Sequence, residues 1–126
     1  MVNRPALSKG EMEIARALWS VGPATVRQVF ESLPKNHMDF ATVQTYLRRL
    51  DTKGYANSKL QGRVRVYSAR VQAKKVIRDT VNDLIQRLFA GETMPLVRHL
   101  IEDHGIEENE IAELRHLIDE LERGSR

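Results

Sequence analysis

The sequence predicts a mainly α-helical protein with one small β-hairpin, divided into two regions near residue 71. In the first region, three segments with helical apolar spacing precede a short run in which valines and arginines alternate. The second region has helical spacing throughout. Charge divides the chain at nearly the same place, because residues 1–70 contain 12 Lys and Arg against 5 Asp and Glu, whereas residues 71–126 contain 8 against 12. We therefore predict one domain over residues 1–71 and a second over residues 72–126.

The composition narrows the chemistry available to the protein. With 126 residues the chain can bury a core without covalent cross-links, and it has no cysteine for a disulfide, a thiolate nucleophile or a Cys-ligated metal. It contains no run of about 18 apolar residues, and its N-terminal residues lack the apolar stretch of a secretory signal. We therefore expect a cytoplasmic protein without a membrane partner.

The first two predicted helices carry the same capping signal. Ser8 lies three residues before Glu11, which is the spacing of a capping box. Thr25 and Gln28 repeat this spacing, and Pro34 ends the second helix. Apolar residues at helical spacing follow each cap: Ile14, Leu18, Trp19, Val26, Val29, Phe30 and Leu33. Both segments are therefore predicted to be amphipathic helices, with Trp19 in the core.

A third helix is predicted between Asp39, a good N-cap, and Gly54, which suits the left-handed conformation that ends many helices. One face is apolar and is expected in the core: Val43, Leu47 and Leu50. The opposite face is polar, contains no acid and is basic toward its C-terminal end: Ala41, Thr42, Gln44, Thr45, Arg48 and Arg49. Tyr46 lies at the margin, where it either fills the core or lies along a bound partner.

A β-hairpin is predicted over residues 55–68, with a turn at Gly62 and with valines that alternate with arginines and Tyr67. Tyr67 is expected to pack in the core, whereas Lys59, Arg63 and Arg65 lie near the tip. Three helices followed by a basic hairpin is the element order of a winged helix-turn-helix domain.

The polar face of the third helix suits the major groove of double-stranded DNA. That groove admits one α-helix and presents hydrogen-bonding base edges and thymine methyl groups. We assign base reading to this face: Ala41, Thr42, Gln44, Thr45 and Arg48. Contacts to the phosphate backbone, or to the minor groove for the hairpin, are assigned to Thr25 at the start of the second helix, Arg49, Lys59, Arg63 and Arg65.

The second region predicts three further helices, over residues 72–89, 94–105 and 106–124. Each is short and has a single apolar stripe, so it cannot bury that stripe alone. The helices need one another and, more plausibly, a second copy of the chain. The expected dimer interface consists of Leu84, Leu88, Leu96, Leu100, Ile111, Leu114, Ile118 and Leu121.

The first 70 residues resemble the penicillinase repressor family of BlaI, MecI and CopY type, and the acidic helical half resembles it loosely. The resemblance rests on EMEIARALWSVGPATVRQVFESL, on the pattern Thr-Val-x-Thr-x-Leu-x-Arg-Leu-x-x-Lys-Gly from Thr42 to Gly54, and on the hairpin that ends at Tyr67. It implies a homodimeric winged-helix repressor, with dimer contacts from the C-terminal helices and a palindromic operator that overlaps a promoter.

Two features of that family are missing from this sequence. Members that control β-lactamase genes are inactivated by proteolysis at an Asn-Phe bond, and the corresponding pair here is His99-Leu100. Either an inactivating protease of different specificity acts on this chain, or release does not occur by cleavage. Copper-responsive members carry a C-terminal cysteine motif, which this chain lacks, so copper sensing of that type is excluded.

Functions other than DNA binding have less support in the sequence. The sequence has no Gly-rich phosphate loop, no Gly-x-Ser-x-Gly and no His-Glu-x-x-His, so we predict neither an enzyme nor a cofactor. His99 and Asp103 could share a helical face, but a metal site there is not predicted. A winged-helix module that binds acidic proteins and a ligand- or metal-responsive winged-helix regulator remain alternatives. The operator, the regulated genes and the inducing signal are not encoded in any motif.

Overall fold

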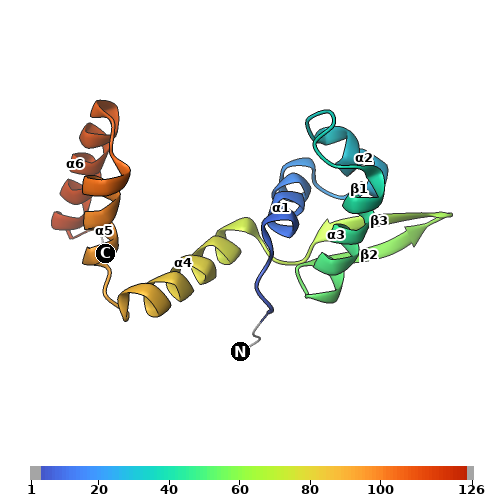
Figure 1. Ribbon diagram of the computed structural model, residues 1–126, viewed down its shortest axis with the longest axis horizontal. Coiled ribbons are helices and arrows are strands. Elements are labelled where there is room, and N and C mark those ends of the chain that lie inside the picture. Colours follow the sequence, from blue (N-terminus) through green and yellow to red (C-terminus); the bar gives the residue numbers. More distant parts are fainter. Residues whose placement is uncertain (1–3, 125–126) are drawn as a thin grey trace. The chain divides into compact units, whose positions relative to one another are not determined.

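The computed structural model describes residues 4–124 and confirms a mainly helical chain with a small antiparallel sheet. Along the chain (Figure 1) its elements are α1 (Lys9–Val21), β1 (Ala24–Thr25), α2 (Val26–Ser32), α3 (Phe40–Thr52), β2 (Ala56–Gln61), β3 (Val64–Ala69), α4 (Ala73–Phe89), α5 (Met94–His99), the π-helix η1 (Leu100–His104) and α6 (Glu108–Glu122). The chain forms two compact units, one ending at Arg78 and the other beginning at Asp79. The predicted division after residue 71 falls just before α4, and residues 1–3 and 125–126 of the predicted domains lie outside the described residues.

Each of the first three helices begins at its predicted cap. The Ser8 hydroxyl accepts the Glu11 N–H at 3.2 Å, and the Glu11 carboxylate accepts the Ser8 N–H at 2.9 Å. Thr25 and Gln28 form the same reciprocal pair, with distances of 3.1 and 2.8 Å. Asp39 Oδ1 accepts the backbone N–H three residues later at 2.8 Å. Local hydrogen bonds therefore set where each helix starts.

The core of the first unit lies between the three helices and the sheet. Its largest fully buried side chains are Ile14, Leu18, Val29, Val43, Leu47 and Leu50. Tyr67 of β3 is buried with them, and the half-buried Trp19 donates from Nε1 to the Val71 carbonyl oxygen at 2.9 Å. Both aromatic residues therefore pack in the structure as the sequence predicted.

The sheet has the strand order β1-β3-β2, with both pairs antiparallel. The predicted hairpin is confirmed, and Gly62 occupies its turn with a φ of 68° that favours glycine. Strand β1 was not predicted, because two residues are too few to show an alternating pattern. It sets Ala24 opposite Tyr67 and so attaches the hairpin to the segment that leads into α2.

The second unit differs from the prediction at residues 94–105, where a single helix was expected. The α-helical pattern of α5 ends at His99, and η1 follows as a wider turn. The Gly105 N–H donates to the Leu100 carbonyl oxygen at 3.1 Å, which is the five-residue spacing of a π-turn. Apolar periodicity does not distinguish one such turn from the α-helix around it.

No described residue after Val76 is buried. Large apolar side chains of α4, α5, η1 and α6 are instead exposed, among them Leu88 at 69%, Leu121 at 67% and Ile118 at 52%. Within residues 4–124, no helix has both the length and the apolar character needed to cross a membrane.

Leu47→Ala should lower the free energy of unfolding by about 2–5 kcal/mol, because it removes a fully buried side chain and leaves a cavity. Leu60→Ala, at a side chain that is 61% exposed, should change it by less than about 0.5 kcal/mol. Urea unfolding followed by circular dichroism measures both variants. Equal losses in the two would contradict the core described above.

Candidate nucleic-acid interface

The outward face of α3 is the face that the sequence predicted. Val43, Leu47 and Leu50 are at most 1% exposed, so the opposite side of the helix must face away from the core. There, Ala41, Gln44, Arg48 and Arg49 are exposed, and Thr42 and Thr45 are half-buried. The structure brings several of these residues together in one open depression, which is lined by Asp39, Ala41, Thr42, Thr45, Tyr46 and Arg49.

The N-terminal end of α3 is held by charge and by aromatic packing. The hydrogen bonds that Asp39 receives from Thr42 hold the pKa of the Asp39 carboxyl below its ordinary value of 3.8. The Phe40 ring meets the Phe30 ring edge-on at 5.7 Å between centroids, and the Arg27 guanidinium lies 4.9 Å from the Phe40 centroid. This aromatic contact could not be predicted from the sequence, because residues 30 and 40 belong to different helices.

Tyr46 packs against α1 and also borders the depression. A Cβ built on Gly10 would lie 2.7 Å from the Tyr46 ring, so glycine is what lets the two helices approach here. The Arg49 guanidinium lies 5.7 Å from the centroid of the same ring. The ring therefore serves the packing of α1 on α3 and supports a basic side chain on the exposed face.

The C-terminal end of α3 is tied to the first turn of α1. Lys53 Nζ lies 2.6 Å from Glu11 Oε1, and Arg49 Nη1 lies 3.9 Å from Glu11 Oε2. Arg48, in contrast, is exposed and forms no ion pair within the described part of the chain. This role of Glu11 was not predicted from the sequence, because Lys53 is 42 residues away along the chain.

The hairpin presents its basic residues on different sides. Lys59 pairs with Val66 in the ladder and Arg65 with Leu60, so Lys59 and Arg65 lie on opposite faces of the two strands. Arg63 follows the turn and is exposed. Apolar side chains also reach solvent near the tip, where Leu60 is 61% and Val64 is 50% exposed.

Arg65 of the hairpin is linked to α3 by two hydrogen bonds through Ser58. Arg65 Nη1 donates to Ser58 Oγ at 3.0 Å, and Ser58 Oγ donates to Asp51 Oδ2 at 2.8 Å. This chain of hydrogen bonds fixes the hairpin relative to the end of the helix. A rigid hairpin beside an outward helix face is the arrangement that a two-part DNA contact requires.

Thr25 is less available for a phosphate than the sequence suggested. Its N–H donates to the Gln28 side chain, and its hydroxyl accepts the Gln28 N–H. A phosphate contact at the start of α2 would therefore use the hydroxyl proton of Thr25 rather than its N–H.

His99 and Asp103, the residues of the second unit considered for a metal site, contact each other. His99 Nδ1 lies 3.0 Å from Asp103 Oδ2, with both side chains more than half exposed. No group of three or more His, Asp or Glu side chains within residues 4–124 is arranged to hold a metal ion. His99 and Leu100 lie at the junction of α5 and η1.

An outward polar helix beside a basic hairpin on a three-helix core defines a winged helix-turn-helix DNA-binding protein. The chain belongs to the penicillinase repressor family, whose model matches residues 7–120. This match confirms the family resemblance. Members of the family are DNA-binding transcriptional repressors rather than enzymes.

Individual relatives agree with this assignment. The chain is 27% identical over 117 residues to the penicillinase repressor of Bacillus licheniformis, covering 92% of this chain and 91% of that protein. It is 24% identical over 114 residues to the methicillin resistance regulatory protein MecI of Mammaliicoccus sciuri, covering 89% and 92% respectively. The solution structure of the DNA-binding domain of the repressor BlaI matches with a TM-score of 0.51 and 31% identity, over 58% of this chain and 90% of that one.

Asp39→Asn should lower stability near neutral pH while keeping an oxygen that accepts the Thr42 N–H. Because the folded-state pKa of Asp39 lies below 3.8, its charge stabilises the folded protein above that pH, and this contribution is lost as the pH falls through the folded-state value. The difference in unfolding free energy between the two proteins should therefore vanish in strong acid. Asp39→Ala, which also loses the hydrogen bond, should remain less stable than Asp39→Asn at every pH. A difference between the native protein and Asp39→Asn that did not change with pH would contradict this.

Proposed function

We propose that this chain is a homodimeric repressor that reads a palindromic operator through the outward face of α3, with the β2–β3 hairpin as its wing. The observation that carries the proposal is the outward polar face of α3, with Gln44, Arg48 and Arg49 exposed, which lies opposite a fully buried apolar face. The BlaI domain that matches this fold is named as DNA-binding, which supports assigning the same role to residues of this first unit.

The side chains of α3 fit the floor of the major groove. Gln44 can pair with the edge of adenine, and the methyl groups of Ala41 and the two threonines can meet thymine methyl groups. Arg48 is exposed and forms no ion pair among residues 4–124, so we assign it to a guanine edge or a phosphate. These residues differ in what they recognise, so the face can distinguish one base sequence from another.

The wing supplies contacts that do not depend on sequence. Lys59 and Arg63 are exposed near the hairpin tip, and Arg65 is positioned by Ser58. Cations held in this way suit phosphates or the minor groove, and they make binding sensitive to salt.

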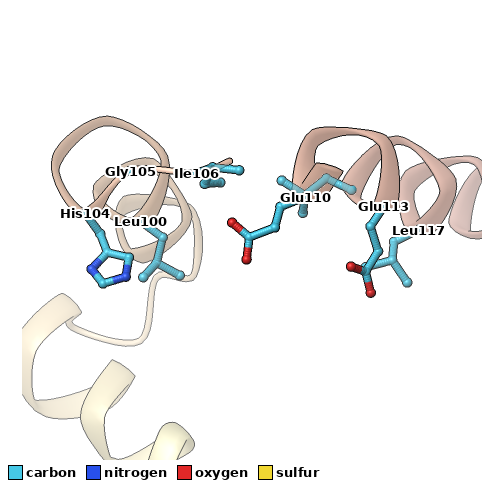
Figure 2. A pocket seen from close by; sticks show the side chains of 8 residues that line it. Leu100, His104, Gly105, Ile106, Glu110, Glu113 and Leu117 are labelled. Carbon is cyan, nitrogen blue, oxygen red and sulfur yellow. The ribbon is translucent and has the colours of Figure 1, made fainter. Parts of the chain in front are cut away.

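The second unit supports the homodimer. None of its described residues is buried in the single chain, and short amphipathic helices are not stable with their apolar stripes in water. Figure 2 shows a hollow with Leu100 of η1 on one side and Leu117 of α6 on the other. Ile106 and Leu114 also line it, together with the polar side chains of His104, Glu110 and Glu113. The proposed interface comprises Leu84, Leu88, Leu96, Leu100, Ile111, Leu114, Ile118 and Leu121. A two-fold symmetric dimer requires a two-fold symmetric operator.

We infer that this protein is not released from DNA by cleavage at an Asn-Phe bond. The junction of α5 and η1 carries His99-Leu100, so a protease specific for Asn-Phe has no substrate there. Release then requires a protease of different specificity or a bound ligand.

Gln44→Ala should cost about 1–3 kcal/mol at one base pair of the preferred site, with smaller effects elsewhere. Arg63→Ala should weaken binding to all sequences alike and reduce the slope of log affinity against log salt by about 1. Fluorescence anisotropy with a panel of single base-pair variants, repeated at several salt concentrations, measures both. The same profile for the two variants would refute the division between reading helix and wing.

Replacing Leu114 and Ile118 together by Asp should produce monomers that bind operator half-sites weakly. The double variant Asn109→Asp with His116→Asp puts two acids on the other side of the same helix and should remain dimeric. Sedimentation velocity reports the oligomeric state of each. If the first variant stayed dimeric, the interface would have to lie on α4 instead.

A further inference from the structure

Glu11 is the only charged residue that is buried within residues 4–124, with 2% of its surface exposed. It lies in the first turn of α1 and accepts hydrogen bonds from the Ser8 N–H at 2.9 Å and from Lys53 Nζ at 2.6 Å. Arg49 Nη1 lies 3.9 Å from its second oxygen. One buried carboxylate therefore faces two of the three cations in the C-terminal half of α3 and its cap.

Stability alone does not account for a charge at this position. Burial raises the pKa of Glu11, but the hydrogen bonds from Lys53 and Ser8 and the positive charge of Lys53 outweigh it, so the net pKa is lowered and the group stays ionised at neutral pH. Replacing a buried ion pair by packed apolar groups is often neutral or stabilising. The effect of this pair on the DNA-binding face offers a different reason for the charge.

The pair turns Lys53 inward. Its side chain is 24% exposed, and its Nζ also donates to the Ala6 carbonyl oxygen at 2.9 Å. The segment before α1 closes over the same helix end, since Arg4 Nε donates to the Gly54 carbonyl oxygen at 2.9 Å and the Tyr55 hydroxyl donates to the Pro5 carbonyl oxygen at 2.7 Å. Lys53 is thus held by the protein, whereas the neighbouring Arg48 is free of ion pairs within the described residues.

We propose that Glu11 is a specificity-determining positioning residue, which neutralises Lys53 and restrains Arg49 so that the end of α3 does not bind phosphate indiscriminately. The proposal rests on the proposed reading role of α3. Affinity for DNA of any sequence grows with each cation that reaches a phosphate, and such contacts carry no sequence information. An internal acid that pairs with Lys53 and draws Arg49 toward itself, away from the phosphate contact predicted for Arg49 from the sequence, lowers this background. The base contacts of the helix are then left to decide where the protein binds.

The direct test is Glu11→Gln, because glutamine can still accept the Ser8 N–H of the capping box but has no charge. The full-length variant should bind random duplex DNA more tightly, roughly fivefold for each released cation near physiological salt, and its salt slope should steepen by about 1–2. The ratio of operator to random-sequence affinity should fall. A parallel loss of affinity for both DNAs, or no change in the slope, would show that Glu11 acts only in folding.

Lys53→Met provides the matched control, since methionine keeps most of the apolar stem and removes the charge. The salt slope on random DNA should equal that of the native protein, because Lys53 does not contact phosphate when Glu11 is present. In the double variant Glu11→Gln with Lys53→Met, the slope should return toward the native value by about 1. A lower slope in Lys53→Met alone would show that Lys53 contacts phosphate and would overturn the proposal.

The Lys53→Met variant remains informative if Glu11→Gln unfolds or if the native protein shows no operator preference. If Glu11→Gln melts below the assay temperature by circular dichroism, the slope of Lys53→Met still decides whether Lys53 is held internally. If the native protein shows no operator preference, the proposed reading function fails. The slope of Lys53→Met on random DNA then tests the internal pairing by itself.

Discussion

The burial of one face of α3 is the constraint on which the rest of the structure depends. Val43, Leu47 and Leu50 sit against Ile14, Leu18 and Val29 of the other helices, and all six are almost inaccessible to solvent. Because side chains three and four positions apart share a side of a helix, this packing decides which residues of α3 face outward. Both ends are then fixed, by the Asp39 cap at the start and by the Glu11 and Lys53 pair at the finish. A helix held in this way can present its side chains to a groove without a further loss of backbone conformational entropy on binding.

The second unit, in contrast to α3, has no buried apolar face among its described residues. Glu107 and Glu110 form a reciprocal cap at the start of α6, whereas α5 begins without a side-chain cap, and no described residue of this unit is fully buried within the single chain. Secondary structure is therefore encoded locally, whereas the burial that would stabilise it has to come from outside the chain. The proposed homodimer would remove this deficit, since a second copy would supply the missing apolar surface and a second reading helix for a two-fold symmetric operator.

The sequence was most informative where the determining signals are local. Ser8 with Glu11 and Thr25 with Gln28 are three residues apart, and the stripe from Val43 to Leu50 has helical spacing, so both could be recognised without knowledge of the fold. Long-range contacts could not be recognised in this way. The Glu11 and Lys53 pair joins positions 42 residues apart, Phe40 meets Phe30 across a loop, and strand β1 is too short for a pattern. The surfaces predicted for DNA and for the dimer could be named from sequence, but which cations are free could be read only from the structure.

Selection from a random pool of duplex DNA decides whether the outward face of α3 reads a base sequence. The purified full-length protein is used at near-physiological salt, and the bound duplexes are sequenced after several rounds. The account predicts a two-fold palindrome with half-sites separated by about whole helical turns. Recovery of no motif, with only weak and salt-sensitive binding, would contradict it.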